Sequence, residues 1–415
     1  MMQGRDGFSL AHRAALMIAA VAAVVVMAST GYALEDSVIV TNQGGLLAGT
    51  IATFNANTNN AKNIKPAGII SNATVPVTLA PGVVVTLPVA DVLTGVRVNP
   101  TNGPGITNAS YVLSDLAVLA PGSPDILAFF SQGVFGNATS AVGGTFTFAD
   151  SSTTPPTPIV QLALPQDIAF ATSAFSGGPV GTDVAIGDLF VSNYAGGATG
   201  SVIHFPGNVG TVANGLGLIT NPFGATPPVI PSLVLEDSTF DATTNPFGCM
   251  AGVSTGLLGP VGVGLDAENN IWVANSGFRG AFPSYITEYP PGSFGCTPPT
   301  ATIGLGTLVS AGFLAVDPEG DLWVTDLSQN AVFEFSQAGA VLTTIQGKKT
   351  GLKSPMGIAL GNETVPIVYV ANEGGGNILE YADAEDGGLL NRKTFGRIQG
   401  KKTKIRQPVG VSVIP

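Results

Sequence analysis

One near-repeat of about 15 residues constrains this chain of 415 residues more than any other feature. The stretch LWVTDLSQNAVFEFS (322–336) returns as LFVSNYAGGATGSVIHFPG (189–207) and VYVANEGGGNILEYA (368–382), and IWVANSG (271–277) copies its first half. Each copy has an apolar strand that ends in Asn or Asp, a turn of small residues, and a second strand that contains an aromatic residue. Internal repetition of this kind sets the architecture, so it is considered first.

Two more strands complete the repeating unit. A short strand precedes each copy, often after proline, as in GPVGVGLD (259–266) and SPMGIALG (354–361), and a weaker one such as VLTTIQG (341–347) follows. Four strands per unit predict the blade of a β-propeller. An isolated four-stranded sheet cannot bury both faces, whereas blades packed around an axis bury them against their neighbours. Scarce charge (10%) with 55 Gly and 30 Pro agrees with short strands joined by turns.

The two ends of the chain complete the blade count. QPVGVSVIP (407–415) supplies an inner strand and the chain then stops, while SVIVTNQGGLLAGTIATFN (37–55) opens in the middle of a unit. We therefore expect both termini to share one blade, which leaves no open sheet edge. The expected second strands begin near Val38, Leu127, Leu189, Ile271, Leu322 and Val368. The prediction is an all-β, six-bladed propeller of four-stranded blades that forms one domain over residues 34–415, with seven blades as the alternative.

The best-formed units resemble a known repeat. GDLWVTDLSQNAVFEFS (320–336) and GKKTGLKSPMGIAL (347–360) are similar to NHL repeats, whose pattern is a glycine-rich turn, P-x-G-I-A-V-D and then G-x-I-Y-V-A-D. The resemblance is good from about residue 259 onward and weak before 164. It implies a propeller related in fold to gluconolactonase-like propellers. Because lactonases, a lyase, receptor-like ectodomains and binding modules share this repeat, function has to be argued from a site.

The N-terminus predicts export. Arg5 and Arg13 precede the apolar run AALMIAAVAAVVVMA (14–28), and small residues follow, which is the order of a signal peptide over residues 1–33. We expect a periplasmic or extracellular protein without a membrane span after cleavage, and an uncleaved anchor is the alternative. In an oxidising compartment Cys249 and Cys296 are expected to form a disulfide, with two free buried thiols as the alternative.

Catalytic residues are hard to find in the sequence. His12 lies in the signal peptide, and His204 lies in a third strand, away from the axis, so we expect no Ser-His-Asp triad. In gluconolactonase-like propellers the residue after an inner-strand proline helps to hold an axial metal ion. At that position only Gln166, with its neighbour Asp167, is polar, whereas Val261, Met356 and Val409 are apolar. We expect no cofactor, and a metal-dependent lactonase-like hydrolase that uses Gln166 and Asp167 is the alternative.

Two recurring positions have a structural interpretation. The Asn or Asp that closes each second strand is expected to accept hydrogen bonds from backbone N–H groups of the following turn. Aromatic residues at one blade position are expected to form the core between blades. The two sets are Asn42, Asn193, Asn275, Asp326 and Asn372, and Phe190, Trp272, Trp323 and Tyr369.

The basic residues are not explained by the fold. Ten of the sixteen Lys and Arg follow Gly347, and they include two near-copies, IQGKKTGLKSP (345–355) and IQGKKTKIRQP (398–408). Each copy joins the outer strand of one blade to the inner strand of the next. We therefore expect a basic patch on one face of an acidic protein (pI ≈ 4.5), formed by Lys348, Lys349, Lys353, Lys401, Lys402, Lys404 and Arg406. The alternative is that these are solvated turn residues without a function.

These observations favour an exported binding or scaffold module, expected to be a monomer, over an enzyme. Its expected partner is an unidentified protein or an anionic polysaccharide or other envelope component, which the patch would attract. Residues 34–415 carry 14 basic and 26 acidic side chains, a net charge of −12, so nucleic acid is not the expected partner.

Overall fold

The computed structural model describes residues 37–43, 50–55, 64–71, 74–80, 83–88, 93–98, 110–114, 126–130, 148–150, 157–160, 164–176, 183–194, 200–205, 233–236, 254–293, 295–361, 367–382 and 396–414. The signal peptide over residues 1–33 and the cysteine at position 249 lie outside these residues, so cleavage and the disulfide stay predictions. No helix in the described part of the chain is long and apolar enough to cross a membrane.

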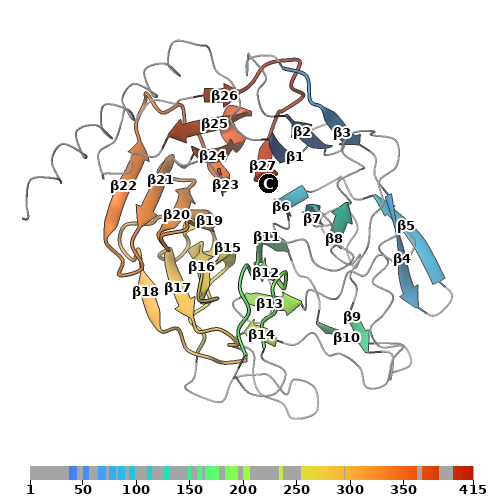
Figure 1. Ribbon diagram of the computed structural model, residues 1–415, viewed down its shortest axis with the longest axis vertical. Helices are drawn as coiled ribbons and strands as arrows, with labels where there is room; N and C mark the ends of the chain where they lie inside the picture. Colours follow the sequence, from blue (N-terminus) through green and yellow to red (C-terminus); the bar gives the residue numbers. More distant parts are fainter. Residues whose placement is uncertain are drawn as a thin grey trace, which may run out of the picture.

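Strands dominate the described residues, as expected for an all-β protein. The described helices are α2 (Gly277–Gly280) and the 3₁₀ turn η5 (Glu373–Gly375). Five sheets have four strands each, and Figure 1 shows them arranged around a common centre. In order from the centre outward, they are β27 (Pro408–Ile414), β1 (Ser37–Asn42), β2 (Thr50–Phe54), β3 (Gly68–Ser71); β11 (Pro165–Phe170), β12 (Leu189–Asn193), β13 (Ser201–Phe205), β14 (Leu233–Glu236); β15 (Pro260–Leu265), β16 (Ile271–Asn275), β17 (Tyr285–Tyr289), β18 (Ala301–Ile303); β19 (Ala311–Val316), β20 (Leu322–Asp326), β21 (Ala331–Phe335), β22 (Val341–Gln346); and β23 (Pro355–Leu360), β24 (Ile367–Asn372), β25 (Asn377–Ala382), β26 (Gly396–Ile398).

Three smaller sheets are also described. β6 (Leu93–Val98), β7 (Ser110–Ser114) and β8 (Ile126–Phe130) form a three-stranded sheet. β4 (Thr74–Ala80) pairs with β5 (Val83–Pro88), and β9 (Phe148–Asp150) pairs with β10 (Thr157–Val160). Figure 1 places these two hairpins on the outer side of the ring.

The inner strands form a closed ring. β27 contacts β6, β6 contacts β11, and the contacts continue through β15, β19 and β23 back to β27. This arrangement is that of a propeller, in which each sheet packs face to face on the next.

The expected closure by both termini is confirmed. β27 near the C-terminus pairs antiparallel with β1 near the N-terminus, from Ser37 opposite Ile414 to Thr41 opposite Gly410. β1 is thus the second strand of a blade whose inner strand comes from the other end of the chain. This pairing removes the free edge that each terminus would otherwise present.

The sequence interpretation of the second unit was wrong. Leu127 lies in β8, the third strand of its sheet counted from the centre, and not in a second strand. The inner strand is LTGVRV (β6) and the second strand is SYVLS (β7). β7 lacks the terminal Asn or Asp that marks the other second strands, and β6 lacks the proline that begins four of the other five inner strands.

The core lies between the blades, as expected from the repeated aromatic residues. Trp272 of one blade packs with Leu322 and Phe335 of the next, and Trp323 packs with Val368. Phe190 and Tyr369 occupy equivalent places in two further clusters. Both tryptophan indoles also donate a hydrogen bond to the aspartate that follows their inner strand, Trp272 to Asp266 (3.0 Å) and Trp323 to Asp317 (3.1 Å).

The Asn or Asp at the end of the second strand has a structural role. Oδ1 of Asp326 accepts a hydrogen bond from the following turn, as expected, through the N–H of Gln329 (2.9 Å). The same position also fastens the loop that enters the blade: Asn275 accepts from Leu258 N–H (2.8 Å) and Asn372 from Lys353 N–H (2.6 Å). These bonds explain the Asn or Asp at these three positions without a ligand. At Asn42 the expectation was wrong, because its Oδ1 has no hydrogen-bond partner among the described residues.

The hydroxyl of Thr41 provides a test of ring closure. It accepts from the N–H of Gly410 (2.8 Å) and donates to the carbonyl of Thr94 (2.9 Å), so it joins β1, β27 and β6. Thr41→Val keeps the shape and leaves both buried groups without this partner, so we expect a loss of about 2 kcal/mol in the free energy of unfolding. Chemical denaturation measures it. The exposed Thr300→Val serves as a control that should change stability by less than about 0.5 kcal/mol, and equal losses would contradict the assigned role of Thr41.

Candidate functional site

The inner strands share a register that defines equivalent positions. The first residue of each strand pairs with the last residue of its second strand, as in Pro260 with Asn275, Pro355 with Asn372 and Leu93 with Ser114. In this register the fifth position is Gly, Ala or Ser in five strands and Arg97 in β6. The third position is Gly in four strands, Phe in β19 and Asp167 in β11. Two adjacent inner strands therefore each carry a charged residue among small and apolar ones.

The Arg97 side chain connects four inner strands. Its Nε donates to the carbonyl of Ile168 in β11 (3.0 Å) and one terminal nitrogen donates to Ile358 in β23 (2.9 Å). The other terminal nitrogen donates to the carbonyl of Leu314 in β19 (3.0 Å) and to Asp167 Oδ2 (3.4 Å). A guanidinium has five N–H donors and four of them are used here. Arg97 thus places a fixed positive charge among the inner strands at the centre of the ring.

Asp167 is the counter-ion, and it is completely buried. Besides Arg97, its Oδ2 accepts from the N–H of Val263 in β15 (3.4 Å), whereas Oδ1 has no hydrogen-bond partner. Burial raises the pKa of Asp167 from 3.8 to about 6, although Arg97 and the backbone N–H groups act in the opposite direction. Desolvation dominates because the side chain is completely buried, which disfavours the charged form of the carboxyl group.

This arrangement does not favour an axial metal ion at the sequence-predicted ligands. The amide of Gln166 donates to backbone carbonyls of its own strand, at Leu164 (3.0 Å) and Pro165 (3.3 Å). Asp167 is paired with a guanidinium, which already supplies the positive charge. A calcium ion needs six to eight oxygen ligands, and an arginine among them would repel it. The metal-dependent hydrolase therefore gains no support from the geometry around these two residues.

One further cluster of acidic side chains lies among the described residues. Asp317, Asp321 and Glu334 bring carboxylate oxygens within 4.8 Å of one another. Asp317 uses one oxygen for the N–H of Asp321 (2.7 Å) and the other for the Trp323 indole, so it is a turn-capping residue. Burial raises the pKa of Asp317.

His204 is a packed residue, as expected. It lies in β13, is buried, and stacks on Phe190 with 4.5 Å between ring centroids. Its Nε2 lies 2.8 Å from Oδ2 of Asp188. This pair fastens the third strand to the turn before the second and leaves no open position for a substrate.

The two basic loops, residues 347–354 and 400–407, have the same backbone structure. In the first, Thr350 donates from both its N–H (3.1 Å) and its hydroxyl (2.7 Å) to the carbonyl of Gly347. In the second, Thr403 makes the same two bonds to Gly400, at 3.1 and 2.7 Å. Both threonines are buried, and each hydroxyl also accepts from the N–H two residues later. The buried threonine therefore fixes a tight turn that holds two lysines outward.

The loops lie on one face, on either side of η5. The N–H of Gly374 donates to the carbonyl of Lys353 in the first loop (3.0 Å), and a Cβ placed on Gly376 would lie 2.7 Å from the carbonyl of Arg406 in the second. All seven basic residues expected in the patch are exposed, and none forms a salt bridge with another residue that the structure describes. Glu373 of η5 is the acid between the loops. We call these seven residues the twin-loop patch.

Comparisons with known proteins give similar folds and no family. No family model matches the sequence, and no curated protein matches it. Similar solved structures include a nidogen/laminin complex (11% identity over 91% of this chain and 98% of that chain, TM-score 0.47) and a putative 6-phosphogluconolactonase from Bacteroides fragilis (14%, 92% and 98%, 0.45). Virginiamycin B lyase from Staphylococcus aureus is a third (11%, 69% and 67%, 0.34). At such identities and scores we draw no argument from them, and the propeller arrangement rests on the sheets described above.

Arg97 was not predicted as a site residue. One signal was present, because residues 34–347 contain four basic side chains and Arg97 is the one inside an apolar strand, LTGVRV. Its partner is 70 residues away in the chain, and the pairing follows only when β6 and β11 are known to be neighbours.

Removing the arginine should expose the cost of burying Asp167. We expect Arg97→Met to lower the free energy of unfolding by about 3–5 kcal/mol, because one charge of a buried pair is left uncompensated. Urea denaturation at pH 7 measures the loss. The exposed Lys65→Met is the control, and Arg97→Met/Asp167→Asn should recover part of the loss. A loss no greater in Arg97→Met than in the control would contradict the bridging role.

The raised pKa of Asp167 predicts a pH dependence. The folded protein holds this proton up to about pH 6, while the unfolded chain releases it near 3.8, so folding takes up a proton between these values. The stabilisation is therefore fully present below about pH 4 and is lost as the pH rises through about 6. Wild type should gain stability relative to Asp167→Asn as the pH falls from 7.5 to 4, by an amount on the order of 3 kcal/mol. A difference in unfolding free energy that stays constant over this range would refute the shift.

Proposed function

We propose that this protein is an exported binding module that engages an anionic polymer through the twin-loop patch. The observation that carries the proposal is a pair of loops with the same backbone structure on either side of η5, which together carry seven exposed cations. Because a buried threonine already fixes the backbone of each loop, the loops need no backbone ordering on binding, which favours association. Their local positive field on a chain with net charge −11 attracts and orients an anionic partner.

Two features of the described structure favour a binding module over an enzyme. The centre of the ring holds an internally paired Arg97 and Asp167, and the described histidine is packed into a blade. We also propose that β6–β8 belongs to the sixth blade of the propeller. Its inner strand lies in the ring between β27 and β11, where one blade is needed for closure.

Two adjacent lysines in each loop provide a test of the proposal. Exchanging Lys348, Lys349, Lys401 and Lys402 together for Gln should weaken binding to heparin resin at least about tenfold at low salt, since each cation near an anionic surface contributes about 1 kcal/mol. The remaining affinity should fall less steeply with salt, because fewer exposed charges are screened. Elution salt and melting temperature are measured together, and the melting temperature should not change.

Two controls distinguish the effect of the charge in the patch from the effect of the net charge of the protein. Changing the same four lysines to Arg should keep the binding, and Lys65→Gln, which removes a cation outside the patch, should leave elution unchanged. If the four-fold Gln variant elutes at the wild-type salt concentration, the patch is not the binding site.

A further inference from the structure

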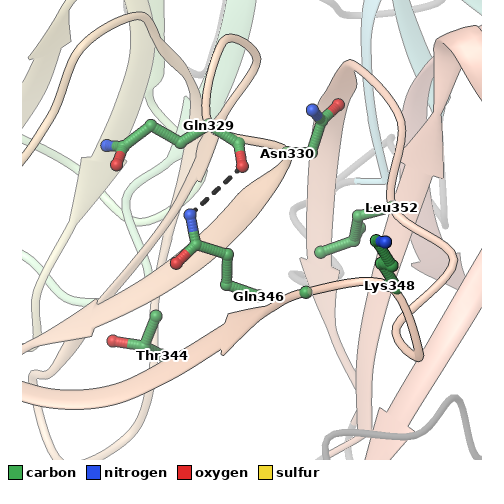
Figure 2. Close-up of a pocket in the computed structure, with 7 residues that line it drawn as sticks. Gln329, Asn330, Thr344, Gln346, Lys348 and Leu352 are labelled. Carbon is green, nitrogen blue, oxygen red and sulfur yellow. Dashed lines mark hydrogen bonds between the residues drawn. The ribbon is translucent and has the colours of Figure 1, made fainter.

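The two halves of the twin-loop patch have different surroundings. The first loop borders a cleft of about 560 Å³ between the β20–β21 turn, the outer strand β22 and the loop itself. Its lining is Gln329, Asn330, Thr344, Gln346, Gly347, Lys348 and Leu352, and Figure 2 shows six of these side chains around the opening. The size falls in the range of ligand clefts. The lining contains three amides, one hydroxyl, one ammonium and one aliphatic side chain, and no acidic group.

Several of these polar groups are already oriented by the protein. Oδ1 of Asn330 accepts from the N–H of Ser354 (2.8 Å), and its Nδ2 has no partner among the described residues. Nε2 of Gln346 donates to the backbone carbonyl of Gln329 (3.3 Å), as drawn in Figure 2, so its Oε1 remains as an acceptor. The cleft thus offers a fixed donor, a fixed acceptor and the Thr344 hydroxyl, with Lys348 at its edge. Oriented groups bind with a smaller entropic cost.

The second loop keeps equivalents of Gln346, Gly347, Lys348 and Leu352 but lacks the other three lining residues. The strand registers place Gly375, Gly376 and Arg397 where the first blade has Gln329, Asn330 and Thr344. The equivalent of Asn330 is thus a glycine, and both residues have a positive φ, 50° and 64°. The chain therefore contains a natural comparison between lysines beside Gln329, Asn330 and Thr344 and lysines beside two glycines and an arginine.

We propose that this cleft binds an acidic saccharide, with Lys348 receiving the carboxylate and Asn330, Gln346 and Thr344 binding ring hydroxyls. The inference rests on the proposed function, because it names the ligand class for one half of the same patch. A sugar hydroxyl both donates and accepts, which the mixed amide and hydroxyl lining complements. Leu352 is the single aliphatic side chain in the lining, so the cleft offers little apolar surface to the hydrophobic anchors of a peptide.

The experiment compares two probes of similar charge, tetragalacturonate and tetraglutamate, by isothermal titration calorimetry at low salt. The cleft variant is Asn330→Gly/Gln346→Ala, which keeps the charge and introduces glycine at a position with positive φ. It should weaken tetragalacturonate binding about tenfold, since two hydrogen bonds are lost, and leave tetraglutamate binding unchanged. Lys348→Gln should weaken tetragalacturonate binding more than the matched Lys401→Gln in the second loop. Circular dichroism confirms that each variant is folded.

The outcomes distinguish this inference from the proposed function. If the cleft variant binds tetragalacturonate like wild type, or if Lys401→Gln weakens it as much as Lys348→Gln, the patch recognises charge alone and the saccharide cleft is refuted. The same holds if tetraglutamate binds as tightly as tetragalacturonate and is equally sensitive to the cleft variant. If the four-fold lysine variant also retains heparin binding, the proposed function fails as well.

Discussion

The ring depends on the close approach of neighbouring inner strands around the axis. A Cβ placed on Gly262 of β15 would lie 2.7 Å from the N–H nitrogen of Leu314 in β19, and one on Gly410 of β27 would lie 2.9 Å from the carbonyl oxygen of Thr94 in β6. These distances are below ordinary van der Waals contact, so the third position of the strand is restricted to glycine there. The same proximity lets one hydroxyl or one guanidinium reach the next blade. Closure by β1 and β27 is therefore stabilised from within the ring as well as along the strands.

Charge in this chain is scarce, and the structure uses it in two different ways. At the axis, Arg97 and Asp167 replace small residues of the repeat and form a desolvated pair whose donors are mostly directed at backbone carbonyls. Such a pair gives little net stability, because desolvation offsets the attraction, but it strongly penalises arrangements that leave either charge alone. On the rim, the lysines of the twin loops stay in water and form no ion pair within the described chain. The first arrangement fixes structure, while the second is available to a partner.

The structural features that repeat from blade to blade could be predicted from the sequence. Those that depart from the repeat could not. Apolar strands that end in Asn275, Asp326 or Asn372 identified their blades, because each of these side chains fastens a loop in the same way. The IQGKKT copies indicated two equivalent connections of consecutive blades, and the two loops have the same backbone hydrogen bonds. β6 and β7 were missed because their pairing depends on neighbours in the ring rather than on local signals. The cleft beside Lys348 combines residues from two turns and an outer strand, and such a combination becomes visible only when the strand register is known.

The Arg97–Asp167 pair at the axis and the exposed loops on the rim together indicate where such a ring can bind a ligand. Here the central arginine is bonded to three backbone carbonyls and to Asp167, so a ligand at the axis would have to compete with four intramolecular hydrogen bonds of Arg97. A loop on the rim faces no such competition, since its backbone is already fixed by a buried threonine and its side chains are solvated. One blade can then vary the lining next to its loop, as Asn330 and Gly376 differ between two otherwise equivalent turns, without disturbing the inner strands. Specificity can therefore differ from blade to blade while the ring itself is unchanged.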